Sequence, residues 1–306
     1  MMHQTWKKPN PYLIPGMQIR GKWNQNVYII KRKLGEGAIG AVYLCETGRG
    51  RQAALKISDK GSSITTEVNV LKAMKQAQEK NLGPYLLDVD DWVKNQNERY
   101  SFYVMEYIRG ESLPNFIKQK GSAWVGVFML QLLDDLDKLH QSGWVFGDLK
   151  TENLLIAKSP ARIRWIDVGG TTKVGRAIKE YTEFYDRGYW GLGSRRAEAS
   201  YDLFSLVMVF LNIYYPKRFE KKKNTKQQLF RKIDAIRALQ PYNDCLKKAV
   251  TGKYQSSAQM RREISMVIYK AQKNGQYTKG ERIYAVESVG IFLVAIIYYL
   301  ASVFLF

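Results

Sequence analysis

A glycine-rich loop placed among β-forming segments constrains the fold of this chain more than any other feature of its sequence. Gly35, Gly37 and Gly40 follow the pattern G-x-G-x-x-G, and Val42 comes two residues later. Segments rich in β-forming residues lie before and after the loop: 27–30, 42–45 and 53–57. A dinucleotide-binding loop of this pattern would open a helix, whereas this arrangement predicts an antiparallel hairpin and a third strand. The glycines would let backbone N–H groups approach phosphate oxygens closely.

A lysine on the third segment adds a positive charge near this loop. Lys56 lies sixteen residues after Gly40 between apolar neighbours, which favours a buried strand position over a solvated one. The helical pattern over 65–74 carries Glu67, whose carboxylate could pair with Lys56 and fix it. Because Glu67 follows Lys56 by only eleven residues, an exposed helix glutamate remains the alternative, and Glu79 is a weaker substitute.

A second set of polar residues lies in the sequence WVFGDLKTENLLI, which covers residues 144–156. Asp148, Lys150 and Asn153 fall in a short loop between apolar strands, and Asp167 follows fourteen residues after Asn153. A proton-accepting carboxylate, together with an Asp and an Asn that ligate Mg²⁺, is the set that phosphoryl transfer from ATP requires. Isolated Asp residues are more often turn formers, but the ordered set of glycine loop, Lys, Glu, Asp and Asn favours this chemistry.

With these motifs, the segment from about residue 28 to 270 resembles the Hanks-type, or eukaryotic-like, protein kinases. The resemblance implies an α+β, bilobal fold with a small β-rich N-lobe and a helical C-lobe. It implies ATP with Mg²⁺, or alternatively Mn²⁺, and protein substrates that carry Ser or Thr, because D-L-K at 148–150 is the pattern of Ser/Thr kinases.

The resemblance also implies a role for each matching residue. The ATP-binding residues would be Gly35, Gly37, Gly40, Val42, Lys56, Glu67 and Glu106, the last in the segment 105–108 that is similar to the adenine-binding hinge. Asp148 would be the catalytic base and Lys150 would steady the transferring phosphoryl group. Asn153 and Asp167 would hold the metal, and Asp202 would be the buried aspartate that opens the central C-lobe helix.

The chain departs from the kinase pattern around the catalytic residues. Phe146-Gly147 stands where H-R precedes the catalytic Asp, and Val168 stands where D-F-G has Phe. We hypothesise that Phe146 and Val168 exchange volume within one packed column. Gly147 cannot bind an activation-loop phosphate as the missing Arg would. We therefore predict that phosphorylation at Thr171, Thr172 or Thr182 is not the main switch.

A second departure lies before Asp202. No A-P-E motif is readable there, and Gln255 lies near the place of the arginine that would pair with its glutamate. Because both partners of this ion pair are absent together, we expect a C-lobe that folds without the pair rather than one that has lost its stability.

The chain carries a net charge of +20, and 13 of these charges lie between Pro216 and Arg282. The cationic residues that we single out here are Lys221, Lys222, Lys223, Lys226, Arg231 and Lys232. Three interpretations of these residues stay open. They form a solvated helical surface, they bind an anionic inner membrane leaflet, or they bind the DNA backbone without recognising its base sequence.

The last eighteen residues, Val289–Phe306, contain no charged side chain. As a helix they would be about 27 Å long, enough for a hydrocarbon core of about 30 Å; a buried core helix is the alternative. Basic residues precede this segment, so the positive-inside rule places residues 1–288 in the cytoplasm. The two cysteines, Cys45 and Cys245, are too few for a disulfide framework and fit a reducing compartment.

This order of parts resembles the short, C-terminally anchored YabT-like kinases of spore-forming Bacillus relatives. The resemblance implies autophosphorylation that responds to DNA, with self-association for phosphorylation between molecules. The expected parts are an N-terminal extension (1–26), an N-lobe (27–108), a C-lobe (109–270), a basic linker (271–288) and a membrane-spanning helix (289–306). The alternatives are a small-molecule phosphotransferase of the aminoglycoside type and a catalytically silent, DNA-binding membrane tether.

Overall fold

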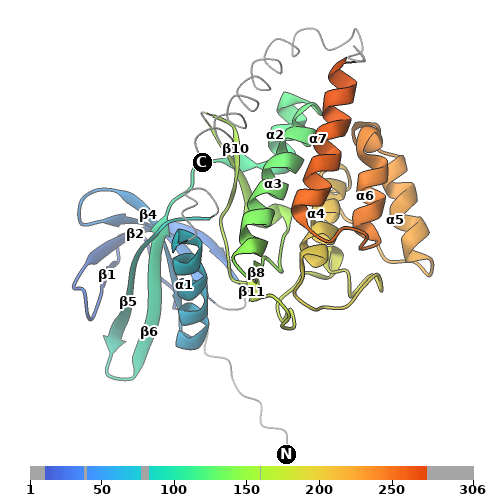
Figure 1. Cartoon of the computed structure of the whole chain (residues 1–306). Coiled ribbons are helices and arrows are strands. Elements are labelled where there is room, and N and C mark those ends of the chain that lie inside the picture. The colour runs from blue at the N-terminus through green and yellow to red at the C-terminus, as the bar shows by residue number, and fades with distance from the viewer. Residues whose placement is uncertain (1–10, 38–39, 77–82, 159, 274–306) are drawn as a thin grey trace, which may run out of the picture.

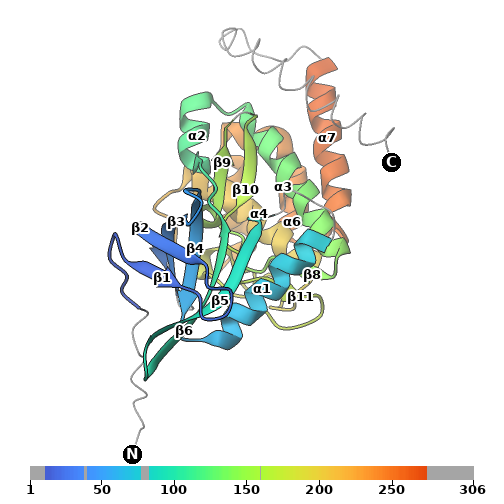
Figure 2. The same cartoon turned by 90° about the vertical axis from the view of Figure 1, so that its left-hand side faces the viewer.

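A six-stranded antiparallel sheet with one helix against it forms the N-terminal lobe, in a computed structural model that describes residues 11–37, 40–76, 83–158 and 160–273. The strand order is β1-β2-β3-β4-β6-β5. The strands and the helix are β1 (Gln18–Arg20), β2 (Val27–Glu36), β3 (Ala41–Thr47), β4 (Gln52–Ser58), α1 (Gly61–Gln76), β5 (Leu86–Asn95) and β6 (Glu98–Glu106). Figure 1 shows this lobe beside the helical C-terminal lobe, and Figure 2 shows α1 lying across the sheet.

The alternation of side chains along β4 explains why Lys56 is buried. Ala53, Leu55 and Ile57 point into a core on the outer face of the sheet, so the residues between them face the opposite side. Ala54 packs there in the main core with α1, and Lys56 follows it with only 4% of its surface exposed. The strand period therefore aims the lysine at α1.

The structure corrects the expected boundary of the N-terminal lobe. Residues 1–26 were expected to be an extension, but β1 lies within them and pairs antiparallel with β2. Leu13 and Ile19 are buried in the outer-face core of the sheet. Their burial beside Ile30 and Phe102 of the sheet shows that these early residues are part of the lobe. The lobe therefore begins by Leu13.

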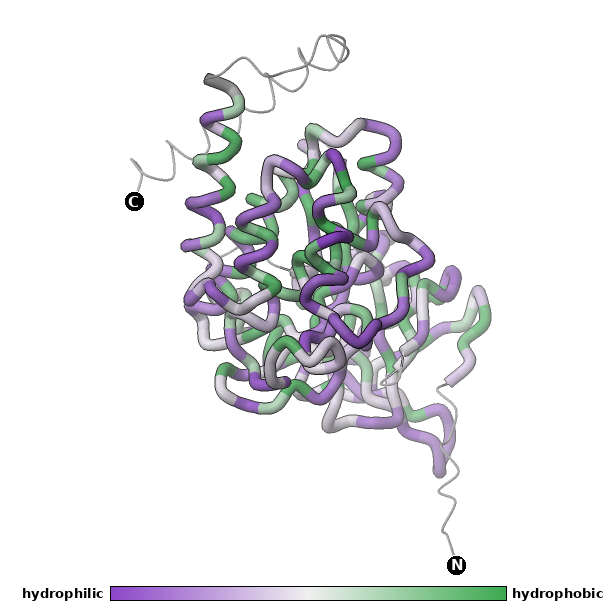
Figure 3. Tube along the Cα trace, turned by 90° about the vertical axis from the view of Figure 1, so that its right-hand side faces the viewer, coloured by the Kyte–Doolittle hydropathy of each residue, from purple (hydrophilic) through white to green (hydrophobic). Residues whose placement is uncertain are grey.

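The C-terminal lobe is a set of helices around the apolar helix α4. The helices are α2 (Leu113–Lys120), α3 (Trp124–Gln141), α4 (Ala199–Tyr214), α5 (Thr225–Asp234), α6 (Asn243–Val250) and α7 (Ser257–Lys273), with short 3₁₀ turns at Thr151–Asn153, Glu183–Tyr185 and Arg237–Tyr242. Residues 201–211 of α4 are all buried, as an all-round apolar helix requires. Along α7, by contrast, hydrophilic and hydrophobic stretches alternate (Figure 3).

Short strands place the catalytic loop between the lobes. They are β7 (Glu111–Ser112), β8 (Trp144–Val145), β9 (Leu154–Ala157), β10 (Arg162–Trp165) and β11 (Thr172–Lys173). β9 lies between β7 and β10, and β8 pairs with β11. The residues between β8 and β9 therefore form a loop held at both ends, as the sequence predicted for Asp148, Lys150 and Asn153.

Different ion pairs stabilise the segment where the A-P-E motif is absent. Arg187 is 5% exposed, and its guanidinium lies 2.6 Å from Glu198 Oε1 and 2.7 Å from the carbonyl oxygen of Ser194. Asp186 is fully buried and lies 2.7 Å from Arg195. These pairs form within the segment 186–198, so no distant partner such as residue 255 is needed. The residues of these pairs follow no regular spacing, so the sequence alone did not reveal them.

The helix pattern predicted over 65–74 lies inside α1, and α7 continues to Lys273, three residues past the expected end of the C-lobe. Among the residues that the structure describes, no helix is both long and apolar enough to cross a membrane. The span expected over 289–306 and the linker from 274 onward lie outside the described residues.

Replacement of Arg187 by Met should lower the free energy of unfolding by about 3 kcal/mol, because the carbonyl and hydroxyl groups bound to the buried guanidinium lose their charged donor. Glu198→Gln should cost less than about 1 kcal/mol, because the Glu198 side chain is 46% exposed. Urea unfolding of the two variants measures the difference. If both variants lose the same free energy of unfolding, Arg187 contributes no more than its ion pair with Glu198.

Candidate active site

The nucleotide lysine expected from the sequence lies in a three-membered charge cluster between the lobes. Lys56 Nζ is 2.8 Å from Glu67 Oε2 on α1 and 3.1 Å from Asp167 Oδ1 after β10. Tyr103 on β6 donates a 2.7 Å hydrogen bond to the same Glu67 oxygen. Glu67 therefore faces Lys56, as expected; Glu79 lies outside the described residues.

The electrostatics keep this lysine charged. Burial disfavours the ammonium ion, but the carboxylates of Asp167 and Glu67 outweigh it and raise the pKa of Lys56 above its usual value. Burial likewise opposes ionisation of Asp167, yet the Lys56 ammonium and the Gly169 N–H hold the pKa of Asp167 below its usual range. The cluster thus presents one fixed cation beside one fixed carboxylate.

The glycine loop joins β2 and β3, as the sequence predicted. Gly35 pairs with Val42 across the hairpin, and a side chain at Gly35 or Gly37 would meet no atom within 4 Å. Gly40 differs, because a Cβ there would lie 2.5 Å from the carbonyl oxygen of Ile57 on β4. The space beside Gly35 and Gly37 is therefore open. The lack of a side chain at Gly40 lets the hairpin approach β4, the strand that carries Lys56.

The catalytic loop brings Asp148, Lys150 and Asn153 together. Lys150 Nζ donates to Asp148 Oδ2, and Asn153 Nδ2 donates to the Asp148 carbonyl oxygen at 2.9 Å. Thr182, from a segment thirty-four residues later, donates to Asp148 Oδ1 at 3.3 Å. Burial raises the pKa of the Asp148 carboxyl, while the hydrogen bonds from Lys150 and Thr182 oppose that rise. Asp148 is therefore a stronger proton acceptor than an exposed aspartate.

Asp202 fixes the loop from below. Its carboxylate is fully buried and accepts hydrogen bonds from the backbone N–H groups of Phe146 (2.7 Å) and Gly147 (2.9 Å). His140 Nε2 lies 2.8 Å from Asp202 Oδ2, and Ser257 lies 3.1 Å from the other ring nitrogen of His140. The sequence identified Asp202 but not His140 and Ser257, because α3 and α7 meet α4 only in the folded lobe.

The structure explains the glycine before Asp148. Gly147 has φ = +80°, a left-handed conformation that favours glycine. A Cβ at this position would lie 2.5 Å from the carbonyl oxygen of Gly170. An arginine is therefore excluded here by the backbone itself. Phe146 and Val168 are both buried in the same core, where the Phe146 ring packs against Trp165 at 4.7 Å between centroids; their exchange of volume stays a hypothesis.

Asn153 and Asp167, the expected metal ligands, each keep one side-chain oxygen that forms no hydrogen bond within the described residues. The Asn153 amide is oriented by its Nδ2 donor bond, which leaves Oδ1 as the remaining oxygen. Asp167 uses Oδ1 for Lys56 and Gly169, and within the described residues no hydrogen bond involves its Oδ2. Oxygen atoms of this kind fit Mg²⁺. The described part of the chain holds no group of three or more His, Cys, Asp or Glu that could bind a metal without further ligands, so substrate phosphates would have to complete such a site.

The expected hinge follows β6. Glu106 lies at its end, where Arg164 on β10 contacts the Glu106 carboxylate at 2.9 Å. Arg164 also donates to the Gly83 carbonyl oxygen at 2.9 Å. The Glu106 side chain therefore holds the two lobes together at the hinge, a contact that the sequence pattern did not indicate.

The three threonines named from the sequence differ in surroundings. Thr171 is 5% exposed, Thr172 donates to the Gly170 carbonyl oxygen at 3.1 Å, and Thr182 donates to Asp148, the expected catalytic base. That none of them is the main phosphorylation switch stays a prediction. Joint replacement of the three would not test it cleanly, because loss of the Thr182 contact would itself impair Asp148.

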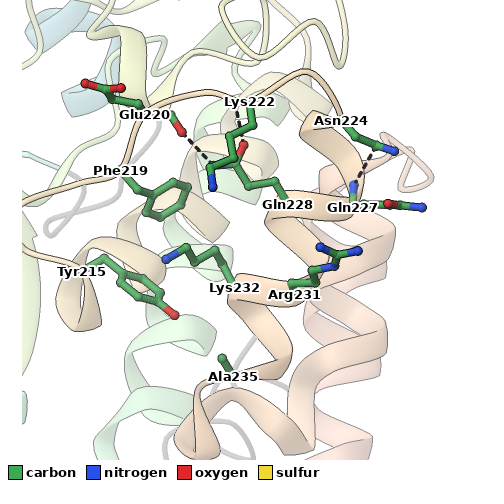
Figure 4. A pocket seen from close by; sticks show the side chains of 10 residues that line it. All are labelled: Tyr215, Phe219, Glu220, Lys222, Asn224, Gln227, Gln228, Arg231, Lys232 and Ala235. Atoms are coloured by element: carbon green, nitrogen blue, oxygen red, sulfur yellow. Dashed lines mark hydrogen bonds between the residues drawn. The ribbon is translucent and has the colours of Figure 1, made fainter.

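The basic residues named from the sequence divide into two groups. Lys222, Arg231 and Lys232 line a pocket of about 660 Å³ between α5 and the segment after α4 (Figure 4). In it, Lys232 Nζ lies 4.1 Å from the Tyr215 ring centroid and 4.9 Å from that of Phe219.

The other three lie outside this pocket. Lys221 donates to the Tyr189 carbonyl oxygen at 2.5 Å, Lys223 is exposed, and Lys226 lies over the Phe230 ring. The six residues therefore do not form one continuous set of free cations, since Lys221 and Lys232 already have partners.

Comparisons with known proteins agree with this geometry. The model for the protein kinase domain matches residues 28–274. The chain belongs to the protein kinase family. Its fold, with a β-rich N-lobe and a helical C-lobe joined by the cluster of Lys56, Glu67 and Asp167, is that of a bilobal kinase.

Among its relatives, the serine/threonine-protein kinase YabT of Bacillus subtilis is 50% identical over 268 residues, which cover 87% of this chain and 79% of YabT. The cell division control protein 2 homolog 2 of Trypanosoma brucei brucei is 29% identical over 55% of this chain and 48% of its own length. MAP3K epsilon protein kinase 1 of Arabidopsis thaliana is 26% identical over 56% of this chain and 13% of its own length. This kinase thus resembles YabT over most of both chains, and the eukaryotic kinases over part of theirs.

Replacement of Thr182 by Val should move the acidic limb of the pH–rate profile to higher pH. The Thr182 hydroxyl stabilises the charged Asp148, so its loss raises the pKa of the base, which is then protonated at a higher pH. At neutral pH we expect a loss of about fivefold, equivalent to one hydrogen bond. The profile of kcat/KM reports this pKa; Thr172→Val, which lacks the contact, should leave the limb in place.

Proposed function

We propose that this kinase transfers the terminal phosphoryl group of ATP to Ser or Thr hydroxyls of proteins, its own chain included. The observation that carries the proposal is the contact of Lys56 with Glu67 and Asp167 between the lobes. Asp148, which carries hydrogen bonds from Lys150 and Thr182, is near enough for the charge of Asp167 to raise its pKa. The similarity to a serine/threonine-protein kinase over 87% of the chain supports the choice of acceptor.

Each residue of the cluster has a part in the transfer. Asp148 accepts the proton of the acceptor hydroxyl, whose oxygen forms a bond to the terminal phosphorus as the bond to the ADP oxygen breaks. Lys150, beside Asp148, steadies the phosphoryl group, and Lys56 orients the phosphates of the nucleotide. Asn153 and Asp167 would hold Mg²⁺, which neutralises charge on the phosphates when it is bound. Catalysis here is mainly positioning and electrostatic stabilisation.

Lys56→Met should lower phosphoryl transfer at least about 100-fold, because a fixed charge on the phosphates is lost. Labelled ATP with a generic protein acceptor measures the transfer, and Lys72→Met, at an exposed position of α1 in the same lobe, serves as a control. Transfer to small aminoglycoside alcohols instead of protein would favour the small-molecule alternative. Label incorporation that survives in Lys56→Met would contradict the proposed site.

We also propose that the basic segment after α4 binds DNA through its phosphates. The cations Lys222, Arg231 and Lys232 line one pocket, and the exposed Lys223 lies beside Lys222 on the same surface segment. Such contacts would add affinity without sequence selectivity. A shared DNA strand would concentrate kinase molecules and favour phosphorylation between them. The segment 289–306 would anchor the chain in the cell membrane with the kinase domain on the cytoplasmic side.

Joint replacement of Lys222 and Lys223 by Gln should reduce the salt dependence of DNA binding, lowering the slope of log K against log salt by about 2. Lys221 is left unchanged because it holds the Tyr189 carbonyl. Lys118→Gln with Lys120→Gln removes the same charge from α2 and should have little effect. Loss of binding to anionic vesicles rather than DNA would favour the inner-leaflet alternative, and no change in either would favour a solvated surface.

A further inference from the structure

Glu180 lies in the middle of an arch of chain that is attached to the catalytic loop at both ends. Two residues before it, Ile178 is buried with Val145, and its Cδ1 lies 3.2 Å from the position of a Cβ at Gly147. Two residues after it, Thr182 donates to Asp148 Oδ1 at 3.3 Å. With at most about 3.5 Å of chain per residue, the backbone of Glu180 must stay close to the catalytic base.

The Glu180 side chain is exposed. Among the described residues no hydrogen bond or ion pair involves its carboxylate, unlike the carboxylates of Glu67, Asp148 and Asp167. Partial desolvation by the surrounding protein raises the pKa of Glu180. The negative charges of Glu67, Asp167 and Asp148 raise it as well, and the positive charge of Lys56 lowers it. The Glu180 carboxylate is therefore close enough to interact electrostatically with the charged residues of the site.

Among the described residues, neither Lys56 nor Lys150 forms an ion pair with Glu180. Lys56 is shared by Glu67 and Asp167, and Lys150 is paired with Asp148. A bound triphosphate would add further negative charge. A cation supplied with the acceptor is therefore the available partner for Glu180, since the acceptor hydroxyl must approach Asp148 to within hydrogen-bond distance.

We propose that Glu180 selects acceptor segments that carry a Lys or Arg near the phosphorylated Ser or Thr. The proposal rests on the protein kinase function above and names its substrate class. An extended peptide advances about 3.3 Å per residue, so a basic side chain within a few residues of the acceptor reaches Glu180. The carboxylate also repels acidic segments, which the net charge of +20 would otherwise attract.

The test uses the full chain and synthetic peptides with one Ser in an Ala-Gly background. A single Arg, Gln or Glu is placed in turn at each of the four positions before and after the Ser. We expect that at one or two positions kcat/KM is about fivefold higher for Arg than for Gln, the upper range of a partly exposed ion pair. Glu at the same positions should be the poorest substrate.

Three variants decide the role of the carboxylate. Glu180→Gln should abolish the Arg preference while changing kcat/KM for the Gln peptides less than twofold, and Glu180→Lys should favour the Glu peptides. Glu183→Gln removes an exposed carboxylate three residues further along the same segment and should behave as the unaltered chain.

Other outcomes overturn the proposal. These are no Arg preference in the unaltered chain, a preference that survives in Glu180→Gln, or an equal loss on all peptides, which would mark a role in folding or metal binding. Autophosphorylation is measured in the same reactions. If it proceeds while no peptide is preferred, the selection by Glu180 fails and the kinase function stands; if both are absent, the proposed function itself fails.

Discussion

One buried carboxylate holds the catalytic loop in place, and the rest of the site depends on it. Asp202 has no exposed surface and accepts the N–H groups of Phe146 and Gly147. Buried backbone donors need a partner, so this contact fixes the left-handed turn at Gly147 and the direction of Asp148. From Asp148 the contacts continue to Lys150, and then to Thr182 in the following segment. His140 steadies the carboxylate from the side.

A second constraint joins the two lobes. Lys56 comes from the sheet, Glu67 from α1 and Asp167 from the C-terminal lobe, and the ammonium ion contacts both carboxylates. Breaking a buried charge pair is costly because it leaves an uncompensated charge. The pairs therefore keep the sheet, α1 and the segment after β10 in fixed positions relative to one another. Arg164 and Glu106 form a further ion pair at the hinge. The two lobes are therefore joined by charge pairs at Lys56 and at the expected hinge.

The departures from the kinase pattern have structural reasons. Gly147 stands where an arginine is usual because the chain passes within contact distance of Gly170 in a left-handed conformation. The ion pair of the missing A-P-E motif is replaced by Arg187 with Glu198 and by Asp186 with Arg195, all within one short segment. The segment 186–198 is thus held by ion pairs among its own side chains. Thr182 and Glu180 lie in the part of this segment that returns to Asp148.

The sequence determined the elements and motifs whose residues are close together in the chain. The hairpin of the glycine loop, the strand position of Lys56 and the loop of Asp148, Lys150 and Asn153 follow from local periodicity and spacing. The tertiary structure alone decided which distant groups meet: Tyr103 on Glu67, His140 on Asp202 and Thr182 on Asp148. The start of the N-terminal lobe was missed for the same reason, because the three residues of β1 are recognisable as a strand only by pairing with β2. Local patterns record the preferences of neighbours along the chain, whereas these contacts join residues 30 or more positions apart, or depend on a partner strand.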